Sequence, residues 1–241
     1  MPAQFTAPTT YFLEEGKANL QDCLKVAFEA ARNQNIGKLV IFTSEGEGVR
    51  LALTEFCSQD QYNHIKLVAV TFPKGKRFTT TDGQPLQVDI TPENQQLFQE
   101  RGVPVVRAHL PFDPIRSPQE QTRCLAHDLA LIGDALAIFG GSMSLCVQAV
   151  AVACDAGAVD MLEHVIALTA DTAILVQAAC TRRMLSDFVV REVLCKPVVL
   201  TIGRKESAER LASEAPKAQL APVETAQLPP EARCRPKKSN E

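Results

Sequence analysis

The sequence predicts an α/β protein with three layers, in which a central, mostly parallel β-sheet lies between two layers of helices. Two observations carry this prediction. Short runs rich in β-branched residues alternate with longer segments that show helical periodicity. The short runs are almost continuously apolar, which is typical of parallel strands covered by helices on both faces.

The first part of the chain contains three strand signals and two helix signals. Asn19 is expected to begin the first helix, with Asp22 complementing the free N–H groups of its first turn. Its apolar residues recur at helical spacing up to Ala31, and Gly37 is expected to end it. The segments expected here are strands at 11–13, 38–42 and 65–72, and helices from residue 19 and at 49–57.

The second part alternates in the same way but contains two irregular segments. Residues 73–91 are polar and rich in turn formers, and residues 109–122 contain three prolines. Residues 144–156 are apolar nearly all round, so this helix is expected in the core. The segments expected are helices at 92–100, 123–139 and 144–156, and strands at 103–107, 164–168, 173–177 and 193–195.

Length and composition predict one domain followed by a tail. The chain has 241 residues, of which 46% are apolar and 22% are charged, and its formal net charge is −3. This length suits a single α/β domain, which we expect over residues 1–203. Residues 204–241 contain five prolines and no aromatic residue, so we expect a disordered tail that buries too little apolar area to fold.

Charge and composition argue against several partners and compartments. The weakly acidic balance, the absence of Trp and the presence of only two Tyr predict no nucleic-acid binding. The segment Met1–Thr10 lacks the pattern of a secretory signal. The uncharged stretch Ala135–Cys154 is long enough to suggest a membrane span, but Gly140 and Gly141 interrupt it, so no span is expected there. Eight cysteines without a CxxC pair suit thiols in a reducing compartment. We therefore expect a cytoplasmic protein without membrane contact, and a homo-oligomer stays an open alternative.

The sequence predicts no metal centre. Cys124 and His127 are spaced to lie on one helix face and would form half of a metal site. A second pair of ligands with matching spacing does not follow.

The segment Thr43–Gly48, between a strand and a helix, is the first candidate binding loop. Gly46 and Gly48 let backbone N–H groups turn toward a ligand, and the following helix N-terminus adds partial positive charge. Thr43 and Ser44 supply hydroxyl groups. Together these features suit a phosphate, although Glu45 and Glu47 oppose an anion unless they point away. A plain tight turn is the alternative interpretation.

A basic loop after the next strand is the second candidate. It runs from Thr71 to Phe78 and contains Lys74, Lys76 and Arg77. Because the carboxyl ends of parallel strands share one edge of a sheet, the two loops are expected to meet there and form an electropositive pocket. A solvated run of charges is the alternative.

Other candidate residues also follow or precede strands. His109 follows the strand at 103–107, and Asp171 and Thr172 precede the strand at 173–177. The sequence lacks a GxSxG elbow, an HExxH motif and a Walker A motif, so no catalytic group is predicted.

The order of several short motifs resembles the C-terminal α/β domain of pyruvate kinase. Closer still are the stand-alone proteins of that superfamily, which lack the kinase barrel. The resemblance covers about residues 10–197. The motifs are Tyr11-Phe12, Glu15–Asn19, Lys38–Phe42, Ser44-x-Gly46, Cys146–Ala158, His164–Ala167 and Ala170–Ala173.

This resemblance implies a phosphate-binding fold and a candidate cofactor. In pyruvate kinase the domain holds a sugar phosphate at its Ser/Thr-Gly loop, and the stand-alone relatives are associated with FMN. Gly48 stands where these relatives commonly have Thr. Carried over by position, the residues implied for the phosphate are Thr43, Ser44, Gly46 and Gly48. Those implied near the rest of the ligand are Thr71, His109, Asp171 and Thr172, with Lys74 added from the basic loop.

The sequence thus predicts a cytoplasmic protein that binds a phosphorylated small molecule, with FMN as one candidate ligand. It is not expected to be a pyruvate kinase, because a chain of 241 residues leaves no room for the catalytic barrel. A flavin-dependent enzyme of unknown reaction is one alternative. A regulatory or interaction module that uses the tail and a dimer face, without ligand chemistry, is another.

Overall fold

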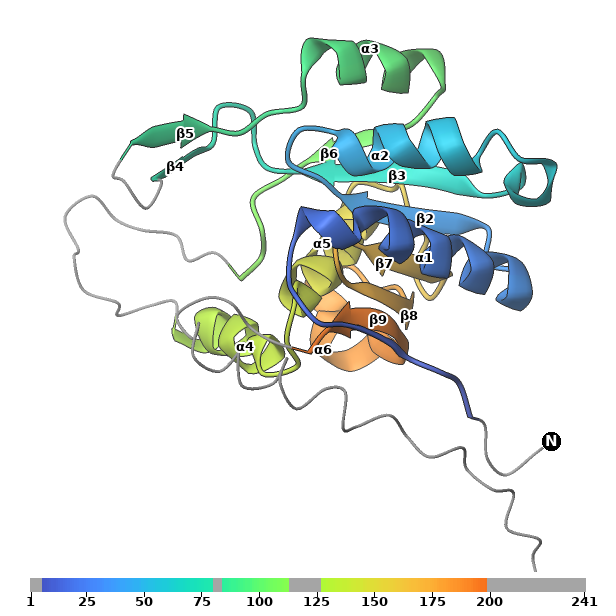
Figure 1. Cartoon of the computed structure of the whole chain (residues 1–241). Coiled ribbons are helices and arrows are strands. Elements are labelled where there is room, and N and C mark those ends of the chain that lie inside the picture. Colours follow the sequence, from blue (N-terminus) through green and yellow to red (C-terminus); the bar gives the residue numbers. More distant parts are fainter. Residues whose placement is uncertain (1–5, 80–83, 113–126, 199–241) are drawn as a thin grey trace, which may run out of the picture.

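A seven-stranded sheet forms the centre of the computed structural model, which describes residues 6–79, 84–112 and 127–198 (Figure 1). The order of its strands is β1-β9-β8-β7-β2-β3-β6. They are β1 (Thr10–Phe12), β2 (Lys38–Phe42), β3 (Lys66–Thr71), β6 (Val105–Arg107), β7 (His164–Leu168), β8 (Ala173–Gln177) and β9 (Val189–Pro197). The predicted tail at 204–241 lies outside the described residues.

The sheet is mostly parallel, as the sequence predicts. The pairs β1–β9, β7–β2, β2–β3 and β3–β6 are parallel. Strand β8 runs antiparallel to both of its neighbours, β7 and β9. Only Thr169–Thr172 joins β7 to β8, and four residues are too few for the crossover that a parallel pair needs. The chain therefore reverses there and starts β8 at the edge where β7 ends.

Alternating side chains of the central strands enter two separate cores, which confirms the three layers. In β2, Leu39 and Ile41 pack in the core beneath α1, whereas Val40 and Phe42 pack in the core beneath α5. Both faces of this strand are buried, which is why its sequence is apolar without interruption. The helices on the first face are α1 (Leu20–Gln34), α2 (Glu47–Leu51) and α3 (Pro92–Glu100). Those on the second are α4 (His127–Ala137), α5 (Met143–Asp155) and α6 (Met184–Asp187).

Helix α1 begins next to Asn19, as the sequence predicts, but its first turn is not capped as expected and it ends earlier. Asn19 precedes the helix, but its side-chain amide donates to the Glu14 carbonyl (2.7 Å) and does not cap the first turn. The predicted stop at Gly37 is wrong, because Asn35 adopts the left-handed conformation (φ 55°) that ends the helix. Asn tolerates this conformation through local hydrogen bonding of its short side chain.

The segment expected to be irregular after β3 contains a two-stranded hairpin. Strands β4 (Arg77–Thr79) and β5 (Pro85–Gln87) pair antiparallel, apart from the main sheet (Figure 1). Within the described ranges, no helix is long and apolar enough to cross a membrane.

The Phe28 side chain is the centre of an aromatic cluster in the first core, and its removal tests the packing. It is fully buried, stacks on Phe56 (ring centroids 4.8 Å apart) and meets Tyr62 edge-on (5.2 Å). We expect Phe28→Ala to lower the free energy of unfolding by about 3–5 kcal/mol, since it leaves a cavity. Urea denaturation measures this, with Leu185→Ala as the control at a side chain that is 83% exposed. The control should change stability by less than about 0.5 kcal/mol. Equal effects of the two variants would contradict the packing described.

Candidate functional site

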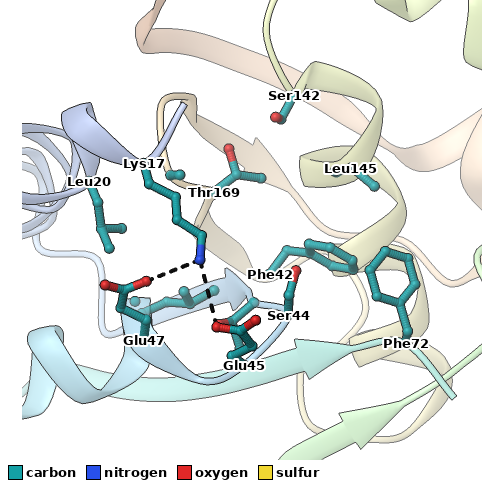
Figure 2. Close-up of a pocket in the computed structure, with 14 residues that line it drawn as sticks. Lys17, Leu20, Phe42, Ser44, Glu45, Glu47, Phe72, Ser142, Leu145 and Thr169 are labelled. Carbon is teal, nitrogen blue, oxygen red and sulfur yellow. Dashed lines mark ion pairs between the residues drawn. The ribbon is translucent and has the colours of Figure 1, made fainter. Parts of the chain in front are cut away.

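A pocket of about 200 Å³ opens where β2, β3 and β7 end (Figure 2). Because these strands are parallel neighbours, their carboxyl ends lie at one edge of the sheet, as predicted. Loops before α1 and α5 complete the walls. The lining residues are Lys17, Leu20, Ile41, Phe42, Thr43, Ser44, Glu45, Glu47, Gly48, Phe72, Ser142, Leu145, Thr169 and Ala170.

The loop after β2 is held in one conformation by its neighbours. The backbone N–H of Gly46 donates to Thr43 Oγ1 (3.0 Å), and the Asn94 side-chain amide of α3 donates to the Glu45 carbonyl (2.8 Å). Gly46 is left-handed (φ 96°), and a Cβ there would lie 2.9 Å from Asn94 Cβ. A side chain at this position would therefore be strained and would collide with α3.

The first turn of α2 leaves backbone donors beside the pocket. The first helical hydrogen bond runs from Arg50 N to the Gly46 carbonyl (3.0 Å). The amides of residues 47–49 precede this bond and therefore lack an acceptor within the helix. Gly48 lets the turn pack closely, because a Cβ there would lie 3.4 Å from the Ile41 and Leu20 side chains.

The charges at the pocket differ from the electropositive rim that was predicted. Lys17 Nζ lies 3.4 Å from a Glu47 carboxylate oxygen and 3.7 Å from one of Glu45 (Figure 2). The two glutamates therefore do not point away. One lysine and two carboxylates leave a formal charge of −1 at this end of the pocket.

An apolar wall faces this charged end. Figure 2 shows Phe42 and Phe72 together on one side, with Ser44 between them and the Lys17 group. The two rings meet edge-on, 5.0 Å between centroids, and Phe72 in turn meets Phe78 at 4.9 Å. The pocket is thus polar at one end and aromatic at the other.

The basic loop after β3 reaches the same edge, but its cations do not line the pocket. Lys74 is exposed and absent from the lining, and Lys76 Nζ lies over the Phe78 ring (5.6 Å). Phe72 is the residue of this loop that lines the pocket. Of the other predicted residues, Thr71 is buried in β3 and His109 is exposed, and neither lines the pocket.

Asp171 and Thr172 join three loops instead of lining the pocket. The buried Asp171 carboxylate accepts hydrogen bonds from the Gly16 N–H (2.8 Å) and from Thr172 Oγ1 (2.9 Å). Thr172 Oγ1 also accepts from the Ser142 N–H (3.0 Å). These bonds position Ser142 and Thr169, which do line the pocket. The structure therefore brings Thr43, Ser44 and Gly48 to the pocket, with Gly46 shaping their loop.

Lys17 is the charged pocket residue that the sequence interpretation missed. It begins the 3-10 turn Lys17–Asn19 between β1 and α1. Strand β8 is antiparallel to both β7 and β9, so β7 and β9 run in the same direction. Strand β1 is parallel to β9 and therefore also runs in the direction of β7. The loop after β1 therefore belongs to the same carboxyl edge. The position of Lys17 after this short first strand is the signal that marks it as a pocket residue.

Within residues 6–79, 84–112 and 127–198, no group of three or more His, Cys, Asp or Glu residues is placed to hold a metal ion. Cys124, half of the pair considered for zinc, lies outside these residues.

Comparisons with known proteins give a weak structural similarity to pyruvate kinase. No family model matches the sequence. The pyruvate kinase of Cryptosporidium parvum is 15% identical over 69% of this chain and 24% of its own, with a TM-score of 0.31. The same enzyme in complex with ADP is 13% identical over 76% and 25%, with a TM-score of 0.29. The chain spans about a quarter of the length of these enzymes. The α/β fold class is assigned from the sheet and the two layers of helices described above, not from these comparisons.

Replacement of Gly46 tests how tightly the loop is built. We expect Gly46→Ala to lower the free energy of unfolding by about 2–3 kcal/mol, because it adds left-handed strain and a clash with Asn94. Gly102→Ala is the matched control, since Gly102 is also left-handed (φ 66°) but a Cβ there meets nothing within 4 Å. The control should cost about 1–2 kcal/mol from strain alone. Equal losses in urea denaturation would show that the contact with α3 does not restrict the loop.

Proposed function

We propose that the protein binds a small phosphorylated molecule in the pocket at the carboxyl edge of its sheet. The observation that carries this proposal is the Ser44–Gly48 segment, which lines the pocket and leads into the first turn of α2. Backbone amides without helical acceptors and the partial positive charge of a helix N-terminus favour an anion there. The Ser44 hydroxyl adds a further donor.

Lys17 supplies the positive charge in this proposal, in place of Lys74. Its ion pairs with Glu45 and Glu47 compete with a bound phosphate. All three side chains are 47–68% exposed, so these ion pairs contribute only about 0–1 kcal/mol each. Lys17 can therefore exchange its carboxylate partners for a phosphate at small cost, whereas the two carboxylates continue to repel the ligand.

The size of the pocket favours a small ligand. Its 200 Å³ is below the roughly 300–1,000 Å³ of sites that enclose drug-sized molecules. A compact phosphorylated metabolite fits this volume, and FMN would enter with its phosphate alone. In that case its ring would lie outside, along Phe72 and the partly exposed Phe78.

A cytoplasmic location is part of the proposal. The cysteines of the described chain that form no disulfide are Cys23, Cys57, Cys146, Cys154, Cys180 and Cys195. Free thiols of this kind persist in reducing compartments.

Charge substitutions at the pocket test the proposal. Calorimetric titration with a sugar phosphate, FMN and inorganic phosphate should detect binding of at least one of them. Lys17→Met should weaken that binding about fivefold, and Glu45→Gln with Glu47→Gln should strengthen it by a similar factor.

Lys74→Met is the matched control, because it removes an exposed lysine from the same edge without touching the pocket. It should change the affinity by less than about twofold. Absence of binding by all three compounds, or equal effects of the two lysine substitutions, would overturn the proposal.

A further inference from the structure

The sulfur atoms of Cys154 and Met161 meet at the edge of the sheet opposite to the pocket, and the backbone of Cys180 lies against the Met161 sulfur. Cys154 lies in the last turn of α5, Met161 in the turn before β7, and Cys180 just after β8. Cys154 Sγ lies 3.5 Å from Met161 Sδ. The backbone N–H of Cys180 donates to the same Met161 sulfur (3.2 Å). We call these three residues the sulfur cluster.

A rigid turn holds Met161 in this cluster. Leu162 has a left-handed backbone (φ 64°), which is uncommon for a residue with a large side chain. Its N–H donates to the Ala178 carbonyl (2.9 Å), and the Ala178 N–H donates to the Glu163 carbonyl (2.8 Å). Surrounding bonds thus maintain a strained conformation, which restrains the neighbouring Met161.

A second set of bonds holds the two cysteine-bearing segments together. The Asp155 carboxylate accepts hydrogen bonds from both the backbone N–H (3.0 Å) and the hydroxyl of Thr181. Because Asp155 follows Cys154 and Thr181 follows Cys180, this clamp joins the two segments that carry the cysteines. All three sulfur-bearing residues are partly accessible, and Met161 is 41% exposed.

The surroundings of the cluster favour a cation. Asp155, Asp160 and Glu163 lie near the Cys154 thiol. Carboxylates attract a positive ion. Glu163 is paired with Lys38 Nζ (2.8 Å) and the Arg183 guanidinium with Asp187 (2.6 Å), so the attraction for a cation comes from Asp155 and Asp160.

We propose that Cys154, Met161 and Cys180 form a binding site for Cu(I). Thiolate and thioether sulfurs are soft ligands that select Cu(I), whereas zinc sites are built from Cys, His and carboxylates. On binding, each thiol releases its proton to water, and Cu(I) is held by two thiolates and one thioether without a change in oxidation state. The set escaped the sequence interpretation because the three residues have no motif spacing and one of them is Met.

Anaerobic competition with a chromogenic Cu(I) chelator tests this site in the reduced full-length chain. Cys124→Ser and Cys234→Ser are included in all variants, so that thiols outside the described residues do not contribute. We expect one Cu(I) per chain, and at least a tenfold loss of affinity in Cys154→Ser or Cys180→Ser. Cys57→Ser is the matched control, since Cys57 is a half-buried thiol elsewhere, and it should leave the affinity within about twofold. No Cu(I) binding, or an equal loss in the control, would overturn the proposal.

The thioether ligand has its own test, which also covers the case in which a serine variant fails to fold. Met161→Leu conserves side-chain volume and should keep the fold. X-ray absorption should then show three sulfur ligands around copper in the parent chain and two in this variant. An unchanged sulfur count, or equally tight binding of Zn²⁺ by the parent, would overturn the assignment. Phosphate binding at the opposite edge should be unaffected by Met161→Leu, so the two proposals fail independently.

Discussion

The four-residue turn Thr169–Thr172 is the constraint on which the rest of the structure depends. It is too short for a crossover, so it reverses β8 and starts that strand at the edge where β7 ends. Its buried Asp171 binds the Gly16 N–H, and Thr172 binds the Ser142 N–H. An unpaired group at this depth costs about 1–3 kcal/mol, so the turn and the loops before α1 and α5 are stable only together. Those loops carry Lys17 and Ser142 into the pocket.

Much of the fold could be predicted because burial on both faces leaves a strong pattern in the sequence. The strands Lys38–Phe42, His164–Leu168 and Ala173–Gln177 have the bounds that their apolar runs predict. The hairpin β4–β5 escaped prediction, because its short strands are largely polar and lie apart from the main sheet. The end of α1 was placed at Gly37, since the pattern does not reveal that Asn35 adopts the left-handed conformation.

The sequence predicts which loops reach the candidate site, but it does not predict how the charged side chains there are arranged. Parallel strand order is enough to bring Thr43 and Ser44 to the pocket edge. The pairing of Lys17 with both glutamates depends on where the β1–α1 loop ends, which no local pattern encodes. Lys74 and His109 follow strands at the correct edge, yet their side chains lie outside the pocket, because position along the chain does not determine side-chain direction.

The pairing of β1 with β9 also affects how the protein completes its fold during synthesis. Strand β1 is an edge strand whose partner in the sheet is β9, and Thr10 pairs with Cys195. At about 5–20 residues per second, translation delivers that partner roughly 10–40 s after β1 itself. Contacts so distant in sequence also form slowly. During synthesis β1 therefore stays without its partner strand until Val189–Pro197 has emerged from the ribosome.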